Sequence, residues 1–130
     1  MTKIKTIGVS MKKIMTVLMV AMALAVSPKV LAKTDQALLK EAAKNPVTVA
    51  KAKTLKDETG VSLTGSIVRH VAGDEFEFKD ATGSIMLDID DDLWQPMQLK
   101  AGDRIRVMGE VDTHRSKPTD IEVIKIERLK

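Results

Sequence analysis

The sequence predicts an all-β domain built as a five-stranded barrel, with a short helix between the third and fourth strands and a short N-terminal helical lead. From Val61 onward, apolar residues alternate with polar ones at the period of two that is typical of strands. Gly65 interrupts the first of these strands, and an interior glycine marks a sharp bend, a bulge or a close backbone approach, each of which helps a sheet to curl. The 130 residues suffice for one small domain.

The pattern of residues 1–32 predicts a cleaved secretory signal peptide. Four lysines precede an apolar run over residues 14–26, in which Thr16 is the only polar residue. The run is shorter than the roughly 20 residues of a membrane-spanning helix but fits a signal peptide, and Val30-Leu31-Ala32 offers small residues to a signal peptidase. A buried, uncleaved helix is the alternative, although it would carry polar residues at helical spacing. Met11 could also serve as the start of such a signal.

The charge balance changes once this segment is removed. The whole chain carries 21 basic and 18 acidic side chains, net +3, but five of the lysines lie in the signal, so residues 33–130 are net −2. A slightly acidic domain argues against binding to nucleic acid or another polyanion. There is no cysteine for a disulfide or lipid attachment and no second apolar stretch to anchor the product. We therefore expect an exported, soluble protein of the bacterial periplasm.

Residues 33–46 are expected to form a helical or flexible lead, and residues 47–130 the barrel domain. Thr34 or Asp35 can cap a short helix that ends at Asn45-Pro46. Little apolar surface is available to it, so we expect it to fray or pack weakly. A further helical turn is predicted where Val49 and Ala52 lie three residues apart.

The barrel strands follow from the alternation of apolar residues. In the second and third strands these inward positions are Phe76, Phe78, Ile85, Leu87 and Ile89. Residues 90–95 read as a short helix capped by Asp90, with Leu93 and Trp94 to bury. The fourth strand points Ile105, Val107 and Val111 inward, and in the last strand Ile124 and Ile126 share one face while Ile121 and Val123 share the other. Three meandering strands, a helix and two more strands are the layout of an OB-fold barrel.

Four stretches also resemble the bacterial OB-fold (BOF) family. They are residues 61–68, residues 76–83, Asp88-Ile89-Asp90 followed by Trp94, and residues 107–112. The resemblance covers roughly residues 46–129. It implies a small exported OB domain that works by binding and is linked to tolerance of envelope and oxidative stress. It implies no catalytic residues.

The residues themselves indicate no enzyme and no cofactor. Asp88, Asp90, Asp91 and Asp92 lack the glycine and the final acid of a calcium loop, so we expect no metal there, although divalent metal buffering by this cluster is the alternative function. His70 and His114 are far apart in sequence and are expected to be ordinary surface residues. Two phenylalanines and one tryptophan are too few to stack a nucleic-acid strand, and the alternation predicts that they fill the barrel.

A polar face of the barrel remains as the candidate binding surface, since OB domains usually bind through the outer side of the first three strands and the adjoining loops. The candidates are Thr64, Arg69, Glu77, Lys79, Asp88, Arg104 and Arg106. Mixed charges at close quarters suit a sugar, a peptide or a zwitterionic fragment, or an envelope protein as partner. The sequence therefore predicts a periplasmic, non-catalytic binding module.

Overall fold

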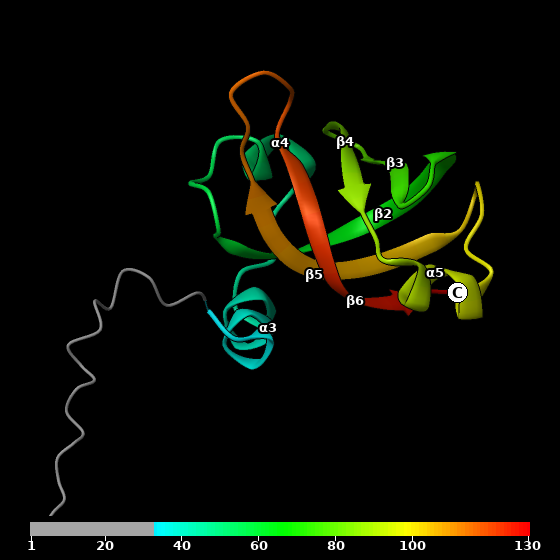
Figure 1. Cartoon of the computed structure of the whole chain (residues 1–130), viewed down its shortest axis with the longest axis horizontal. Coiled ribbons are helices and arrows are strands. Elements are labelled where there is room, and N and C mark those ends of the chain that lie inside the picture. Colours follow the sequence, from blue (N-terminus) through cyan, green and yellow to red (C-terminus); the bar gives the residue numbers. More distant parts are fainter. Residues whose placement is uncertain (1–32) are drawn as a thin grey trace, which may run out of the picture. The chain divides into compact units, whose positions relative to one another are not determined.

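A computed structural model of the chain describes residues 33–130 (Figure 1). The expected signal peptide, residues 1–32, lies outside the described residues, so its cleavage stays a prediction. None of the helices within the described part is long and apolar enough to cross a membrane.

Five strands close into a barrel in the order β2-β3-β4-β6-β5, which confirms the predicted OB fold. All neighbouring strands run antiparallel except β4 and β6, which pair in parallel and place β6 between β4 and β5. The strands are β2 (Gly60–Ala72), β3 (Glu75–Asp80), β4 (Gly83–Asp88), β5 (Arg104–Asp112) and β6 (Asp120–Arg128). The helices are α3 (Asp35–Ala43), α4 (Val49–Ala52) and α5 (Asp91–Met97), the last of which lies between β4 and β5 in sequence as predicted.

The barrel interior holds the apolar residues that the alternation assigned to it. Phe76, Phe78, Leu87 and Ile105 are fully buried, and the outward residues between them are wholly or partly exposed. Ser62 departs from the pattern, because it is 6% exposed although it lies on the outer face. The segment before α4 covers Ser62. The Ser62 N–H donates a hydrogen bond to the carbonyl of Asn45, and the Ser62 carbonyl accepts one from the N–H of Val47.

Two glycines let strands approach more closely than any side chain would allow. A Cβ at Gly65 would collide with the carbonyl oxygen of Lys79 on β3, which confirms the predicted close approach. A Cβ at Gly109 on β5 would collide in the same way with the carbonyl oxygen of Glu122 on β6. The sequence did not single out Gly109.

A bulge beside Gly109 overturns the predicted faces of β6. Gly109 pairs with Val123 and the preceding residue pairs with Lys125, so Ile124 is an extra residue on β6. The bulge shifts the alternation, which puts Ile126 against the same core that Val123 enters. The prediction that Ile124 and Ile126 share a face was therefore wrong.

The N-terminal helix was expected to fray or to pack weakly, and in the structure it packs against the barrel. Thr34 caps α3, its hydroxyl accepting a hydrogen bond from the N–H of Ala37 at 3.1 Å. Leu38 and Ala42 are buried, and α3 lies against β2 and β5. At α5, Asp90 occupies the N-cap position but its side chain makes no capping hydrogen bond.

Candidate functional site

The predicted binding residues do not form a single site. Thr64, Lys79 and Arg104 line one shallow hollow, whose lining holds two cations and one carboxylate, that of Asp80. Arg106 is next to Thr64 in the strand register, and its guanidinium Nε donates to Glu127 at 2.9 Å.

The other predicted residues lie elsewhere on the barrel. Arg69 is ion-paired with Glu77 at 2.9 Å, and the two line a second hollow beside Lys53 and Met86. Asp88 belongs to an acidic region of β4 and β6. The structure thus divides the predicted mixed-charge face into a basic hollow, an internally neutralised pair and an acidic residue.

A row of four carboxylates crosses the outer surface of the barrel at paired positions. Glu75 on β3 is opposite Asp88 on β4, Asp88 is opposite Glu122 on β6, and Glu122 is opposite Glu110 on β5. Each of the four neighbours a buried residue along its strand, which turns its own side chain outward. We call this set the acidic row. Two pairs further along the β5–β6 ladder, Asp112 and Asp120 form a second facing pair of acids.

Three carboxyl groups of the acidic row, those of Asp88, Glu110 and Glu122, have a pKa raised above the ordinary value, first by partial burial and then by neighbouring acids. Partial burial and then the neighbouring charge of Asp88 raise the pKa of Glu122, and burial followed by Glu122 raises that of Glu110. Burial and the charge of Asp120 do the same for Asp88. None of the ion pairs formed within residues 33–130 involves Asp88, Glu110 or Glu122.

Asp103, at another place on this barrel, is neutralised by the chain itself. Burial tends to raise the pKa of Asp103, but hydrogen bonds from the Lys100 N–H and the Arg128 guanidinium outweigh it and leave that pKa below its ordinary value. The Arg128 Nη2 to Asp103 Oδ2 distance is 3.0 Å. The carboxyl groups of the acidic row differ from that of Asp103 because the charged groups beside them are other acids rather than cations.

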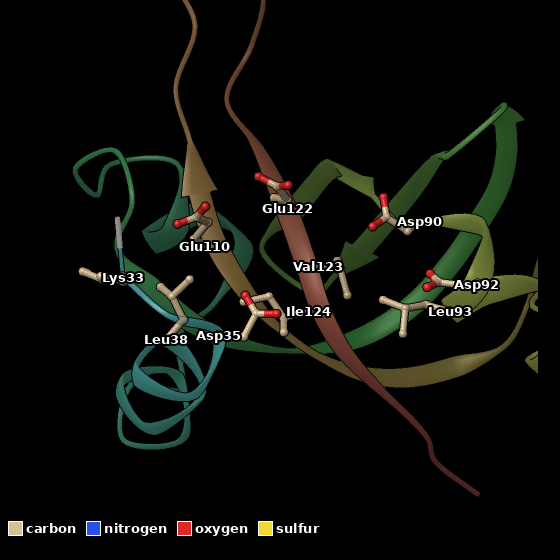
Figure 2. A pocket seen from close by; sticks show the side chains of 10 residues that line it. All are labelled: Lys33, Asp35, Leu38, Asp90, Asp92, Leu93, Glu110, Glu122, Val123 and Ile124. Atoms are coloured by element: carbon tan, nitrogen blue, oxygen red, sulfur yellow. The ribbon is translucent and has the colours of Figure 1, made fainter. Parts of the chain in front are cut away.

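A groove of about 340 Å³ adjoins the acidic row and runs across β6 between α3 and α5 (Figure 2). Figure 2 shows Glu110 and Glu122 on one side of the groove, and Val123 and Ile124 on the strand that crosses it. Its lining is Lys33, Asp35, Leu38, Asp90, Asp92, Leu93, Glu110, Glu122, Val123 and Ile124.

We call this feature the acidic groove. Lys33 is the one cation in its lining, and its ammonium group already contacts Glu41 Oε1 at 2.7 Å and the Glu58 carbonyl at 2.9 Å. Sequence reasoning missed the groove because it depends on the bulge at Ile124 and on the packed position of α3.

Three aspartates form a second feature near one end of the barrel. Asp74, Asp88 and Asp90 each place a carboxylate oxygen within 4.8 Å of the others. The predicted acidic cluster thus contributes only two of its four members, and Asp74 of the β2–β3 turn supplies the third. Oxygen ligands of this kind suit a hard cation such as calcium.

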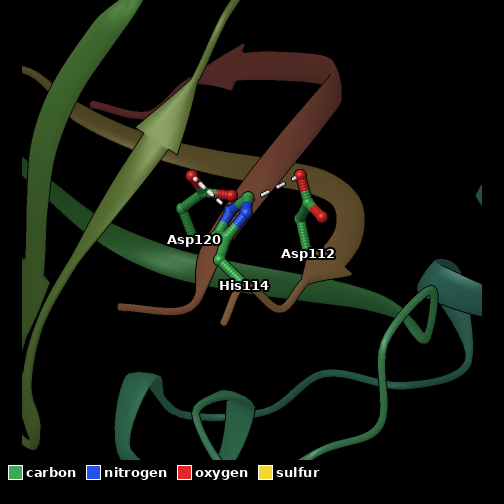
Figure 3. A group of neighbouring side chains, drawn as sticks. All are labelled: Asp112, His114 and Asp120. Atoms are coloured by element: carbon green, nitrogen blue, oxygen red, sulfur yellow. Dashed lines mark hydrogen bonds and ion pairs between the residues drawn. The ribbon is translucent and has the colours of Figure 1, made fainter. Parts of the chain in front are cut away.

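The two histidines behave differently from each other. His70 is exposed, as expected, and its ring stacks on that of Phe76 with centroids 4.3 Å apart. His114 is not an ordinary surface residue, because its side chain is 23% exposed and its Nε2 lies 3.3 Å from Asp120 Oδ2 and 3.7 Å from Asp112 Oδ2 (Figure 3). The signal that sequence reasoning overlooked is an acid at the end of one strand and another at the start of the next, with a histidine in the loop between.

Comparison with known proteins shows which protein family and which relatives this chain resembles. The family model described as "Bacterial OB fold (BOF) protein" matches residues 27–128. The chain is 39% identical over 80 residues to the "Calcium-regulated OB-fold protein CarO" of Pseudomonas aeruginosa, a match that covers 61% of this chain and 69% of CarO. It is 43% identical over 65 residues to the protein YgiW of Escherichia coli K12, which covers half of each chain.

A solved structure agrees with these matches. The structure of YgiW from E. coli superposes with a TM-score of 0.60 at 36% identity, covering 65% of this chain and 90% of that one.

Proposed function

Because the chain belongs to the bacterial OB fold (BOF) family, we propose that it is a non-catalytic binding module of the bacterial envelope and that the acidic groove is its binding site. Export to the periplasm is supported by the apolar segment with preceding lysines in residues 1–32. A role in tolerance of envelope or oxidative stress is supported by the resemblance to the family. The protein would act there by holding a ligand or a partner.

The placement of Glu122 carries the proposal. It lies between Asp88 and Glu110 in the strand register, and within the described residues no cation pairs with any of the three. Like charges directly opposite each other destabilise a sheet. A ligand that brings positive charge to this row would relieve the repulsion, so the arrangement favours binding at the expense of the stability of the free protein.

The lining of the groove indicates the kind of ligand. Acids lie around four apolar side chains, the buried Leu38 and Val123 and the partly exposed Leu93 and Ile124. Its volume lies near the lower end of the range of small-ligand sites, about 300–1,000 Å³. A short peptide or zwitterionic fragment that carries an amino or guanidinium group beside apolar carbon fits both features. A neutral sugar would leave the charges uncompensated, and a nucleic acid would be repelled.

Calorimetry with a matched pair of peptides tests the proposal. We expect the blocked tripeptide Leu-Lys-Leu to bind and the blocked tripeptide Leu-Glu-Leu to show no heat of binding at the same concentration. Glu110→Gln and Glu122→Gln should each weaken binding of the lysine peptide. Glu127→Gln should not, because Glu127 lies on β6 like Glu122 but is paired with Arg106. Equal binding of the two peptides would contradict the proposed site.

The envelope role is tested in cells. Fractionation should recover a shortened protein in the periplasm, and recovery of the uncut chain from the cytosol would contradict export. In a strain that lacks the protein, we expect the wild-type gene to restore growth under peroxide or detergent stress. The Glu110→Gln and Glu122→Gln double variant should restore it less well at equal protein level; restoration to the wild-type level would separate the stress role from the groove.

Calcium binding is a second candidate, favoured by the three converging carboxylates of Asp74, Asp88 and Asp90. The name of the relative CarO, a calcium-regulated protein, is consistent with it. Titration with calcium chloride should then give a saturable heat that Asp90→Asn removes. Asp91→Asn is the matched control, because Asp91 is an exposed neighbour outside the cluster; equal loss in both variants would count against a defined site.

A further inference from the structure

The β5–β6 loop brings three potential metal ligands together at a place that the acidic groove does not include. Asp112 ends β5, Asp120 begins β6, and the two face each other in the last pair of the β5–β6 ladder. Between them the chain turns so that the imidazole of His114 lies over the pair (Figure 3). One nitrogen and two carboxylate oxygens thus lie within 4.8 Å of one another.

We propose that Asp112, His114 and Asp120 form a binding site for a divalent transition-metal ion of the zinc type. The proposal is independent of the acidic groove and of the ligand that the groove would take.

The spacing of the donor atoms fits such an ion. Zinc bonds to imidazole nitrogen and carboxylate oxygen at about 2.0–2.2 Å, so ligands at tetrahedral angles lie about 3.3–3.6 Å apart. His114 Nε2 is 3.3 Å from Asp120 Oδ2 and 3.7 Å from Asp112 Oδ2. The two carboxylate oxygens lie within 4.8 Å of each other, so a rotation of the Asp112 side chain toward the ion would complete the three contacts. Water or another ligand would complete its coordination.

An unsatisfied buried atom provides a separate observation. Asp120 Oδ1 is buried and has no hydrogen-bond partner, and the Asp120 side chain as a whole is 15% exposed. A buried carboxylate oxygen without a partner costs free energy, and native proteins rarely leave one so. A metal ion bound by both oxygens of the Asp120 carboxylate would give Oδ1 a partner.

The cations of the described chain do not supply a hydrogen-bond donor to Asp120 Oδ1. Lys117 is the nearest ammonium group, but its Nζ is 4.0 Å from Asp120 Oδ2 and its side chain is 54% exposed. A protonated His114 would pair with the same Oδ2, because that is the oxygen it faces. Both arrangements engage Oδ2 and leave Oδ1 without a donor, whereas a metal ion bound by both carboxylate oxygens would satisfy it.

The donor set also predicts which ions bind. Imidazole is a ligand that zinc, copper and nickel prefer, whereas calcium takes oxygen ligands. We therefore expect zinc to bind here and calcium not to compete for it. Affinity should fall in acid, because a protonated imidazole cannot ligate a metal.

Titration of the untagged protein with zinc chloride tests the site. We expect one zinc ion per chain, an affinity reduced about tenfold or more by His114→Gln and by Asp120→Asn, and no such change with His70→Gln. His70 is the matched control, since it is the other histidine and is more exposed. Absence of zinc binding, equal loss with His70→Gln, or displacement of zinc by equimolar calcium would overturn the proposal.

A second measurement keeps the test valid if a variant fails to fold. In the wild-type protein, zinc should shift the imidazole nitrogen resonances of His114 at one equivalent and leave those of His70 unchanged. Shifts confined to His70, or none at either histidine, would also overturn the site.

Discussion

Replacement of Glu122 by glutamine should stabilise this protein near neutral pH, which is the reverse of what most substitutions do. The substitution keeps the size of the side chain and removes one of the three facing charges on β4, β6 and β5. Each like-charged cross-strand pair costs about 0.2–1 kcal/mol, and Glu122 belongs to two such pairs. Because the side chain is largely exposed to water, we take the lower part of that range and expect a gain of about 0.5–1 kcal/mol.

The pH dependence of this gain follows from the pKa of Glu122. That pKa is raised above its ordinary 4.5, so the fold favours the protonated carboxyl group. This stabilisation is fully present below the ordinary pKa and is lost as pH rises through the raised value. The wild type and Glu122→Gln should therefore have similar stability at pH 3.5 and differ at pH 7.5.

Thermal unfolding followed by circular dichroism measures the effect. A gain of about 0.5–1 kcal/mol should raise Tm by about 2–8 °C in a domain of this size at low salt. In 1 M sodium chloride, where charges are screened beyond about 3 Å, most of the increase should disappear. Glu127→Gln is the control on the same strand, and it should leave Tm unchanged or lower it, because Glu127 pairs with Arg106. An unchanged or lower Tm for Glu122→Gln at pH 7.5 would refute the reasoning.

Further predictions concern the barrel itself. Gly65→Ala should destabilise the protein by about 1–3 kcal/mol in urea unfolding, since its Cβ would meet the Lys79 carbonyl; an unchanged midpoint would contradict the close approach. Asp80→Ala should cost about 0.5–2 kcal/mol, because the Asp80 carboxylate accepts hydrogen bonds from the N–H groups of Val49 and Thr82. Burial tends to raise the pKa of Asp80, but the hydrogen bond from the Thr82 hydroxyl, followed by these N–H bonds, leaves it below 3.8. The difference between wild type and variant should therefore persist above pH 3.8 and fade as pH drops through the lowered pKa.

The sequence predicted the barrel because the alternation of apolar and polar residues within each strand is enough to identify the core residues. Phe76 and Phe78 alternate with acids on a strand of six residues, and this alternation is enough to assign the buried face. Gly65 indicated the close approach because a glycine within a strand is unusual. The error in β6 has a non-local cause: the bulge at Ile124 lies where Gly109 lets β5 meet the Glu122 carbonyl, and local alternation contains no trace of that contact.

The candidate site was harder to predict than the fold because it depends on which strands become neighbours. Asp88 on β4 and Glu110 on β5 belong to one row of charges only because β6 lies between these strands, with Glu122 opposite both. His114 likewise seemed isolated, since its partners are brought to it by the path of a loop. Local periodicity gives the face of a side chain, and the strand order decides which charges share that face.

Mapping where a cationic ligand binds tests the central claim most directly. In a nitrogen-15 NMR titration with the blocked Leu-Lys-Leu peptide, we expect the largest amide shifts around Glu110, Glu122 and Ile124, and no comparable shifts around Lys79 and Arg104. Shifts centred on that basic hollow, or a spectrum unchanged at millimolar peptide, would contradict the acidic groove as the binding site.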